Sequence, residues 1–163
     1  MASRLCPSII QSLKKGLPEL EKNKVTAKIN LTYKLIADCE SYSLHHAEAA
    51  SYYKKLIDAE PQVAKWHVAF AESSFRADNL GEGLRAIHLA TQLDPKKFEY
   101  KLLEARMLSK AKLYSKAISA YDIALKIAPI HHVENIKKEL ERVISLRDDA
   151  IQQPETTNEM SIQ

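Results

Sequence analysis

A chain of 163 residues and 18.5 kDa is long enough to bury one core, and its length gives no reason to expect a second independent domain. Its 24 basic and 21 acidic residues are mixed along the chain and leave a net charge of +3, a balance that argues against nucleic-acid binding. Only three glycines and six prolines occur, which favours helices joined by short turns over a sheet.

The two cysteines and the apolar segments bear on the cellular compartment. Cys6 and Cys39 form no CxxC pair, so we expect thiols in a reducing compartment; a disulfide between them stays open as an alternative that the sequence does not support. No stretch approaches the ~18 apolar residues of a spanning helix. The apolar patch from Leu5 to Ile10 is followed by Lys14 and Lys15 without a cleavage site. We therefore expect a cytoplasmic protein without membrane insertion.

Residues 1–26 predict an N-terminal helix that packs on the segment after it. Charges of both signs lie between its apolar residues, which argues against a helix on a membrane surface. The apolar residues recur three or four positions apart on one face and are Ile9, Ile10, Leu13, Leu17 and Leu20.

Three helix pairs are expected next, and a proline follows each pair. Pro61, Pro95 and Pro129 stand 34 residues apart, and each disfavours helical geometry in the residue before it. The expected pairs are 27–43 with 46–59, 63–77 with 80–93, and 96–111 with 114–127.

Small residues recur with the same period on the first helix of each pair. Ala37, Ala71 and Ala105 leave room for the second helix to approach closely. This repetition predicts that each pair packs on the next in the same way.

The C-terminal part predicts a capping helix over residues 132–153, with apolar residues spaced three and four apart. Its apolar stripe leaves homo-oligomerisation open. Residues 154–163 are rich in Thr, Gln, Glu and Ser, and we expect them to be disordered.

The 34-residue period and the recurring prolines and alanines resemble the tetratricopeptide repeat (TPR) family. The family's opening aromatic residue is present as Tyr33, falls one residue early as Trp66, and becomes Lys101 in the third repeat. The resemblance implies an all-α helix-turn-helix solenoid wound as a right-handed superhelix, with a helix added at each end. The expected repeats are about 30–63, 64–97 and 98–131.

The resemblance also implies a binding groove, because the first helix of each TPR repeat lines a concave surface where peptides bind. The implied wall is apolar in the middle with mixed charge around it, which suits a peptide with two or three apolar anchors. The wall residues are Leu31, Lys34, Leu35, Asp38 and Tyr42 in repeat one, Lys65, Val68, Ala69, Glu72, Phe75 and Arg76 in repeat two, and Glu99, Leu102, Leu103, Arg106 and Lys110 in repeat three.

A known TPR clamp for the acidic tails of heat-shock chaperones does not match this sequence. The clamp needs Lys and Asn on the first helix, Asn on the second, and Lys and Arg on the third. Only Lys34 is present, and the other slots hold Asp38, Ala69, Glu99 and Leu103. Two of these residues would repel an acidic tail, so we do not expect a chaperone-tail adaptor.

No motif for catalysis, a cofactor or a metal stands out. His45 and His46, like His131 and His132, are adjacent, and adjacent residues on a helix point about 100 degrees apart. Neither pair is therefore expected to hold one metal ion. GxSxG, HExxH and glycine-rich phosphate loops are absent from the sequence.

Two carboxylates occupy unusual positions. Glu40 and Glu104 stand where the repeat often has an apolar or aromatic residue, which indicates either a polar contact across helices or exposure, and solvated rather than catalytic side chains are expected. On the expected wall, Asp38, Glu72 and Glu99 lie among the basic residues and argue against a nucleic-acid groove.

We therefore predict a non-enzymatic adaptor or scaffold that binds a peptide or a helix of a partner protein. One alternative is a chaperone like those of type III secretion translocators, which the chain resembles in size and layout. Another is a regulatory or docking module of an enzyme such as a glycosyltransferase.

Overall fold

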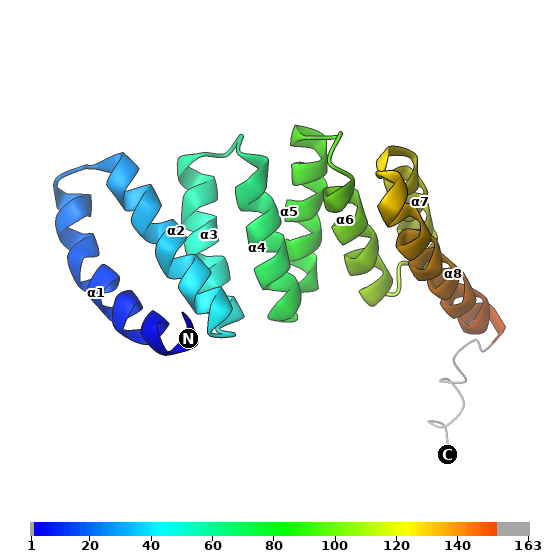
Figure 1. Cartoon of the computed structure of the whole chain (residues 1–163), viewed down its shortest axis with the longest axis horizontal. Coiled ribbons are helices and arrows are strands. Elements are labelled where there is room, and N and C mark those ends of the chain that lie inside the picture. Colours follow the sequence, from blue (N-terminus) through cyan, green and yellow to red (C-terminus); the bar gives the residue numbers. More distant parts are fainter. Residues whose placement is uncertain (1, 153–163) are drawn as a thin grey trace, which may run out of the picture. The chain divides into compact units, whose positions relative to one another are not determined.

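A computed structural model describes the backbone of residues 2–152 and the side chains from Cys6 to Gln152. Within this range the chain forms eight helices and no strand (Figure 1). The expected disordered tail, residues 154–163, lies outside the described residues. None of the described helices is long and apolar enough to cross a membrane.

The helices lie close to their expected positions. The last helix begins two residues earlier than predicted, because the carbonyl of Pro129 accepts a hydrogen bond from the amide of His132 (2.9 Å) and starts the first turn. The bounds are α1 (Ala2–Lys22), α2 (Thr26–Tyr42), α3 (His46–Ala59), α4 (Ala64–Arg76), α5 (Leu80–Leu93), α6 (Phe98–Lys110), α7 (Tyr114–Ile127) and α8 (Ile130–Gln152).

The chain divides into two compact units between Pro95 and Lys96, where the sequence predicts one continuous stack. Unit 1 holds α1 to α5 and unit 2 holds α6 to α8. Within unit 2, buried residues of α6, α7 and α8 form a core of their own, which explains why these three helices group together.

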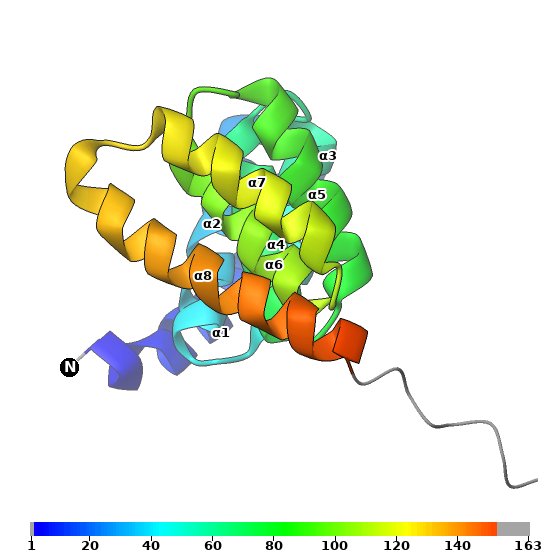
Figure 2. The same ribbon diagram turned by 90° about the vertical axis from the view of Figure 1, so that its right-hand side faces the viewer.

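In unit 1, each helix packs against the next one along the chain. Figure 2 shows α2 and α4 near the middle of the view and α3 and α5 together at the right. Ala37 and Ala71, the recurring small residues of α2 and α4, are completely buried. Ile36, Leu56 and Ile87 are also fully buried, so close helix contact and large apolar side chains together make this core.

The turns inside the helix pairs repeat the 34-residue period in the backbone. Leu44, Asp78 and Lys112 each adopt a left-handed conformation, with φ of 65°, 58° and 59°. After α2, the amide of His45 donates to the carbonyl of Glu40 (2.9 Å) and the amide of Leu44 to that of Ser41 (3.1 Å). This is the Schellman pattern of helix ends, formed here without glycine.

In unit 2, α8 completes the core of the α6–α7 pair. Ile136 and Val143 of α8 are buried together with Phe98 of α6 and Tyr121 of α7. The apolar face of the third pair is therefore covered by the helix that follows it.

Candidate peptide-binding surface

The helix α2 carries large apolar side chains on an exposed face. Leu31, Leu35 and Tyr42 are 56%, 40% and 59% exposed. They are four and seven residues apart, a spacing that places side chains on one side of a helix. Unit 1 therefore offers a row of partly exposed apolar groups on one side of α2.

The charged groups on this face of α2 form ion pairs and hydrogen bonds with neighbouring side chains. Lys34 and Asp38 form an ion pair one turn apart on α2. The other carboxylate oxygen of Asp38 accepts a hydrogen bond from the buried Tyr53 hydroxyl of α3 (2.7 Å). Burial, together with Asp38, raises the pKa of Tyr53 above its usual value, so its hydroxyl remains a donor at physiological pH. Asp38 is therefore an oriented carboxylate at the surface.

Helix α4 supplies the second part of the surface. Its predicted residues are all at least partly exposed: Val68, Ala69 and Phe75 are half-buried, and Glu72 and Arg76 are exposed. After burial and the contact with Asp38, Glu72 adds a smaller Coulombic contribution to the raised pKa of Tyr53. An apolar strip with charges of both signs results.

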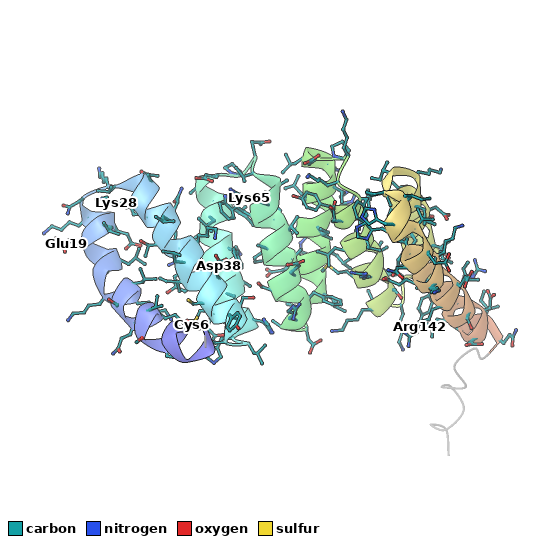
Figure 3. The ribbon with its side chains drawn as sticks, viewed as in Figure 1. Cys6, Glu19, Lys28, Asp38, Lys65 and Arg142 are labelled. Carbon is teal, nitrogen blue, oxygen red and sulfur yellow. The ribbon has the colours of Figure 1, made fainter. Side chains whose placement is uncertain are left out.

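The other predicted residue of α4, Lys65, lies at the start of the helix and stacks on a neighbour. Its Nζ atom is 4.3 Å from the ring centroid of Trp66. Figure 3 labels Lys65 on α4 and Asp38 on α2. Lys65 thus adds a cation at one end of the strip.

Glu60 ties the start of α4 to α2, a link that the sequence reading missed. Its carboxylate accepts hydrogen bonds from the Trp66 indole of α4 (2.7 Å) and the Asn30 amide of α2 (2.9 Å). These bonds, first that of Trp66, lower the pKa of Glu60. The unusual position of Trp66, one residue early for the family pattern, was the signal that could have indicated this contact.

The predicted surface residues of α6 differ from those of α2 and α4, because two of them form contacts inside unit 2. Leu102 packs against the unit 2 core. Arg106 donates two hydrogen bonds to Glu139 of α8, from Nε (2.8 Å) and Nη2 (2.6 Å). Leu103 is half-buried and Lys110 is exposed. We therefore confine the candidate surface to α2 and α4 of unit 1.

A cavity of about 660 Å³ lies beside α1 and the α2–α3 turn in unit 1. At its wall, Glu40 is 4% exposed and accepts hydrogen bonds from Lys14 Nζ (2.7 Å) and His45 Nδ1 (2.9 Å). Burial alone would raise the pKa of Glu40, but these two bonds outweigh it and lower the pKa. The cavity is lined by Pro7, Ile10, Lys14, Glu40, Tyr42, Ser43, Leu44, His45 and Glu48.

Glu40 and Glu104 are not solvated, and for Glu40 the alternative of a polar contact across helices holds. Both are buried, and each forms an ion pair, Glu40 with Lys14 and Glu104 with Lys101 (both 2.7 Å). They replace apolar helix contacts with charged ones, which sequence position alone does not show.

In the described part of the chain, no group of three or more His, Cys, Asp or Glu side chains is arranged to hold a metal ion. His45 bonds Glu40, whereas the rings of His131 and His132 lie 4.3 Å apart and His132 contacts Phe98 (4.8 Å between ring centroids).

Comparison with known proteins finds similarity at the level of structure. No protein-family model matches the chain, and no curated protein matches it. The similar solved structures include MamA, with a TM-score of 0.69 and 18% identity over 88% of this chain and 81% of MamA. They also include the Sgt2 TPR domain from Aspergillus fumigatus, with a TM-score of 0.68 and 15% identity over 82% of this chain and 89% of that domain. The first TPR of Spaghetti (RPAP3) bound to HSP90 peptide SRMEEVD has a TM-score of 0.65 and 18% identity over 72% of this chain and 91% of that structure. The all-α structure and these similarities show that the chain has the fold of a tetratricopeptide-repeat domain.

Proposed function

We propose that the chain is a non-enzymatic adaptor whose α2–α4 surface binds a peptide segment of a partner protein. The observation that carries this proposal is the exposed apolar row of α2 beside the oriented carboxylate of Asp38. Apolar anchors supply most of the affinity of such surfaces, and charges around them set the register of the peptide. No catalytic step is needed for this role.

The charges indicate what the peptide carries. Lys34 and Asp38 neutralise each other in their ion pair, whereas Glu72 adds a further carboxylate on the same surface. A partner with a Lys or Arg between two apolar anchors would place its cation at these carboxylates. We infer that this segment is apolar at both ends and basic in the middle.

The chaperone peptide seen on the RPAP3 domain is a poor fit to this surface. That peptide, SRMEEVD, has three acidic residues near its end. Here the clamp slots hold Asp38 and Ala69, and the one matching cation, Lys34, is already paired. Like charges facing each other weaken binding, so we expect a partner of a different class.

The secretion-chaperone and enzyme-docking alternatives differ from the adaptor in the identity of the client, and no described residue favours either. A cytoplasmic location, and the absence of nucleic-acid binding, stay predictions from the sequence.

A matched pair of variants tests the surface. Leu35 on α2 and Leu89 on α5 are both 40% exposed, but only Leu35 lies on the proposed surface. A displayed peptide library selected on the wild-type protein supplies ligands, whose affinity is then measured by fluorescence anisotropy. We expect Leu35→Ala with Phe75→Ala to weaken binding at least about tenfold.

Leu89→Ala should leave the affinity within about twofold. Circular dichroism must show the same helicity for all three proteins. A ligand that is lost with Leu89→Ala and kept by the Leu35→Ala and Phe75→Ala variant would place the binding surface elsewhere.

A further inference from the structure

The two cysteines, far apart in sequence, meet where α1 packs on α2. The Sγ atoms of Cys6 and Cys39 lie 2.9 Å apart, and both are free thiols. Figure 3 labels Cys6 on the side of α1 that faces α2. No sequence motif links positions 6 and 39, so their contact could not be predicted from the sequence.

The surroundings of this pair are apolar. Cys6 is 7% exposed and is buried with Ile10 and Ile36, while Cys39 and Tyr52 pack beside them. Such a site disfavours a thiolate anion and accepts an uncharged disulfide. Two thiols already in contact also need little chain movement to bond.

We propose that Cys6 and Cys39 form a reversible disulfide that fastens α1 to α2. The oxidant is a small-molecule disulfide such as oxidised glutathione. The thiolate of one cysteine attacks it, forms a mixed disulfide and releases one reduced glutathione. The second cysteine then attacks the mixed disulfide, forms the Cys6–Cys39 bond and releases the other. The protein loses two electrons and two protons, and the glutathione disulfide gains them.

The acid–base state of Cys39 slows its attack on a disulfide at neutral pH. Burial, followed by the contact with Cys6, raises the pKa of Cys39 to about 11, and Asp38 and Glu40 add to the effect. The Cys39 thiolate is therefore rare near neutrality and more abundant in alkaline solution. The resulting bond would act as a covalent lock on α1 that reduction releases.

The disulfide would fix the position of the N-terminal helix α1 and of the cavity wall that α1 forms. α1 is held to the rest of unit 1 by polar contacts such as Lys14 with Glu40 (2.7 Å) and Glu21 with the Tyr33 hydroxyl (2.6 Å). Pro7, Ile10 and Lys14 of α1 form one side of the cavity. A covalent link at Cys6 keeps that side in place.

The test uses the full chain, reduced, freed of reductant and incubated with oxidised glutathione at mildly alkaline pH. Remaining thiols are then alkylated under denaturing conditions and the intact mass is measured. We expect loss of both thiols, a mass lower by two hydrogens and no glutathione adduct. The thermal unfolding midpoint should rise by about 5 to 15 °C and return on reduction.

Cys6→Ser and Cys39→Ser are the controls, and neither should gain an internal bond or thermal stability under the same treatment. Two alkylated thiols in the treated wild-type protein would overturn the proposal. A glutathione adduct on each cysteine, or dimers linked between chains in place of the internal bond, would overturn it as well. Peptide binding is not part of this measurement, so its outcome is independent of the proposed function.

Discussion

At the scale of single residues, the side chain of Glu40 connects α2 to α1. Glu40 replaces an apolar contact with a buried carboxylate that accepts hydrogen bonds from Lys14 of α1 and His45 of the following turn. A buried carboxylate is tolerated only when its partners compensate for lost hydration. The attachment of α1 should therefore depend on pH.

The first prediction concerns this carboxylate. Because the pKa of Glu40 is lowered in the folded state, its ionised form stabilises the fold above the unfolded pKa of about 4.3, and this contribution is lost as the pH falls through the folded pKa. Glu40→Gln should lower the free energy of unfolding by about 1–3 kcal/mol at neutral pH and much less in acid. Urea unfolding at several pH values measures both.

Glu141→Gln on the exposed side of α8 is the matched control and should change stability by less than about 0.5 kcal/mol at every pH. If Glu40→Gln lost equal stability at neutral and acid pH, the ionised carboxylate would not be the stabilising group.

At the level of helices and turns, the sequence predicted the elements well because their signals are local. Pro61, Pro95 and Pro129 mark where helix pairs end. The turns inside the pairs were harder, because left-handed residues at helix ends are usually glycine, and here they are Leu44, Asp78 and Lys112.

The second prediction uses one of these turns. Lys112 is exposed with φ of 59°, a conformation that costs an L residue about 1 kcal/mol and costs glycine almost nothing. Lys112→Gly should therefore raise the free energy of unfolding by roughly 1 kcal/mol, read from a higher midpoint in urea. The same change at exposed Lys137, inside α8, should lower it by about 1 kcal/mol. If Lys112→Gly and Lys137→Gly lowered the free energy of unfolding by the same amount, the backbone at Lys112 would not be strained.

At the scale of the whole molecule, the 34-residue period indicates which residues occupy equivalent positions in successive repeats. It does not indicate which of them form contacts within the chain and are therefore not open to a partner. Leu102 and Arg106 share the period with wall residues of the earlier repeats, yet the first packs in the unit 2 core and the second pairs with Glu139. Their partners lie partly on α8, which follows the repeats and is outside their period. A repeat pattern cannot show such contacts.

The charge of the α2–α4 surface gives the last prediction, which concerns partner choice. Two synthetic peptides with the same leucine anchors and either Lys-Lys or Glu-Glu between them differ only in their central charge. Because Asp38 is oriented by Tyr53 and Glu72 lies near the same hydroxyl, the basic peptide should bind roughly threefold to tenfold more tightly. Added salt should reduce this preference, since exposed charges are screened.

Asp38→Asn should also reduce the preference for the basic peptide, while Glu141→Gln, which removes the same charge from α8, should not. A preference for the acidic peptide, or one untouched by Asp38→Asn, would mean that these carboxylates do not face the bound segment.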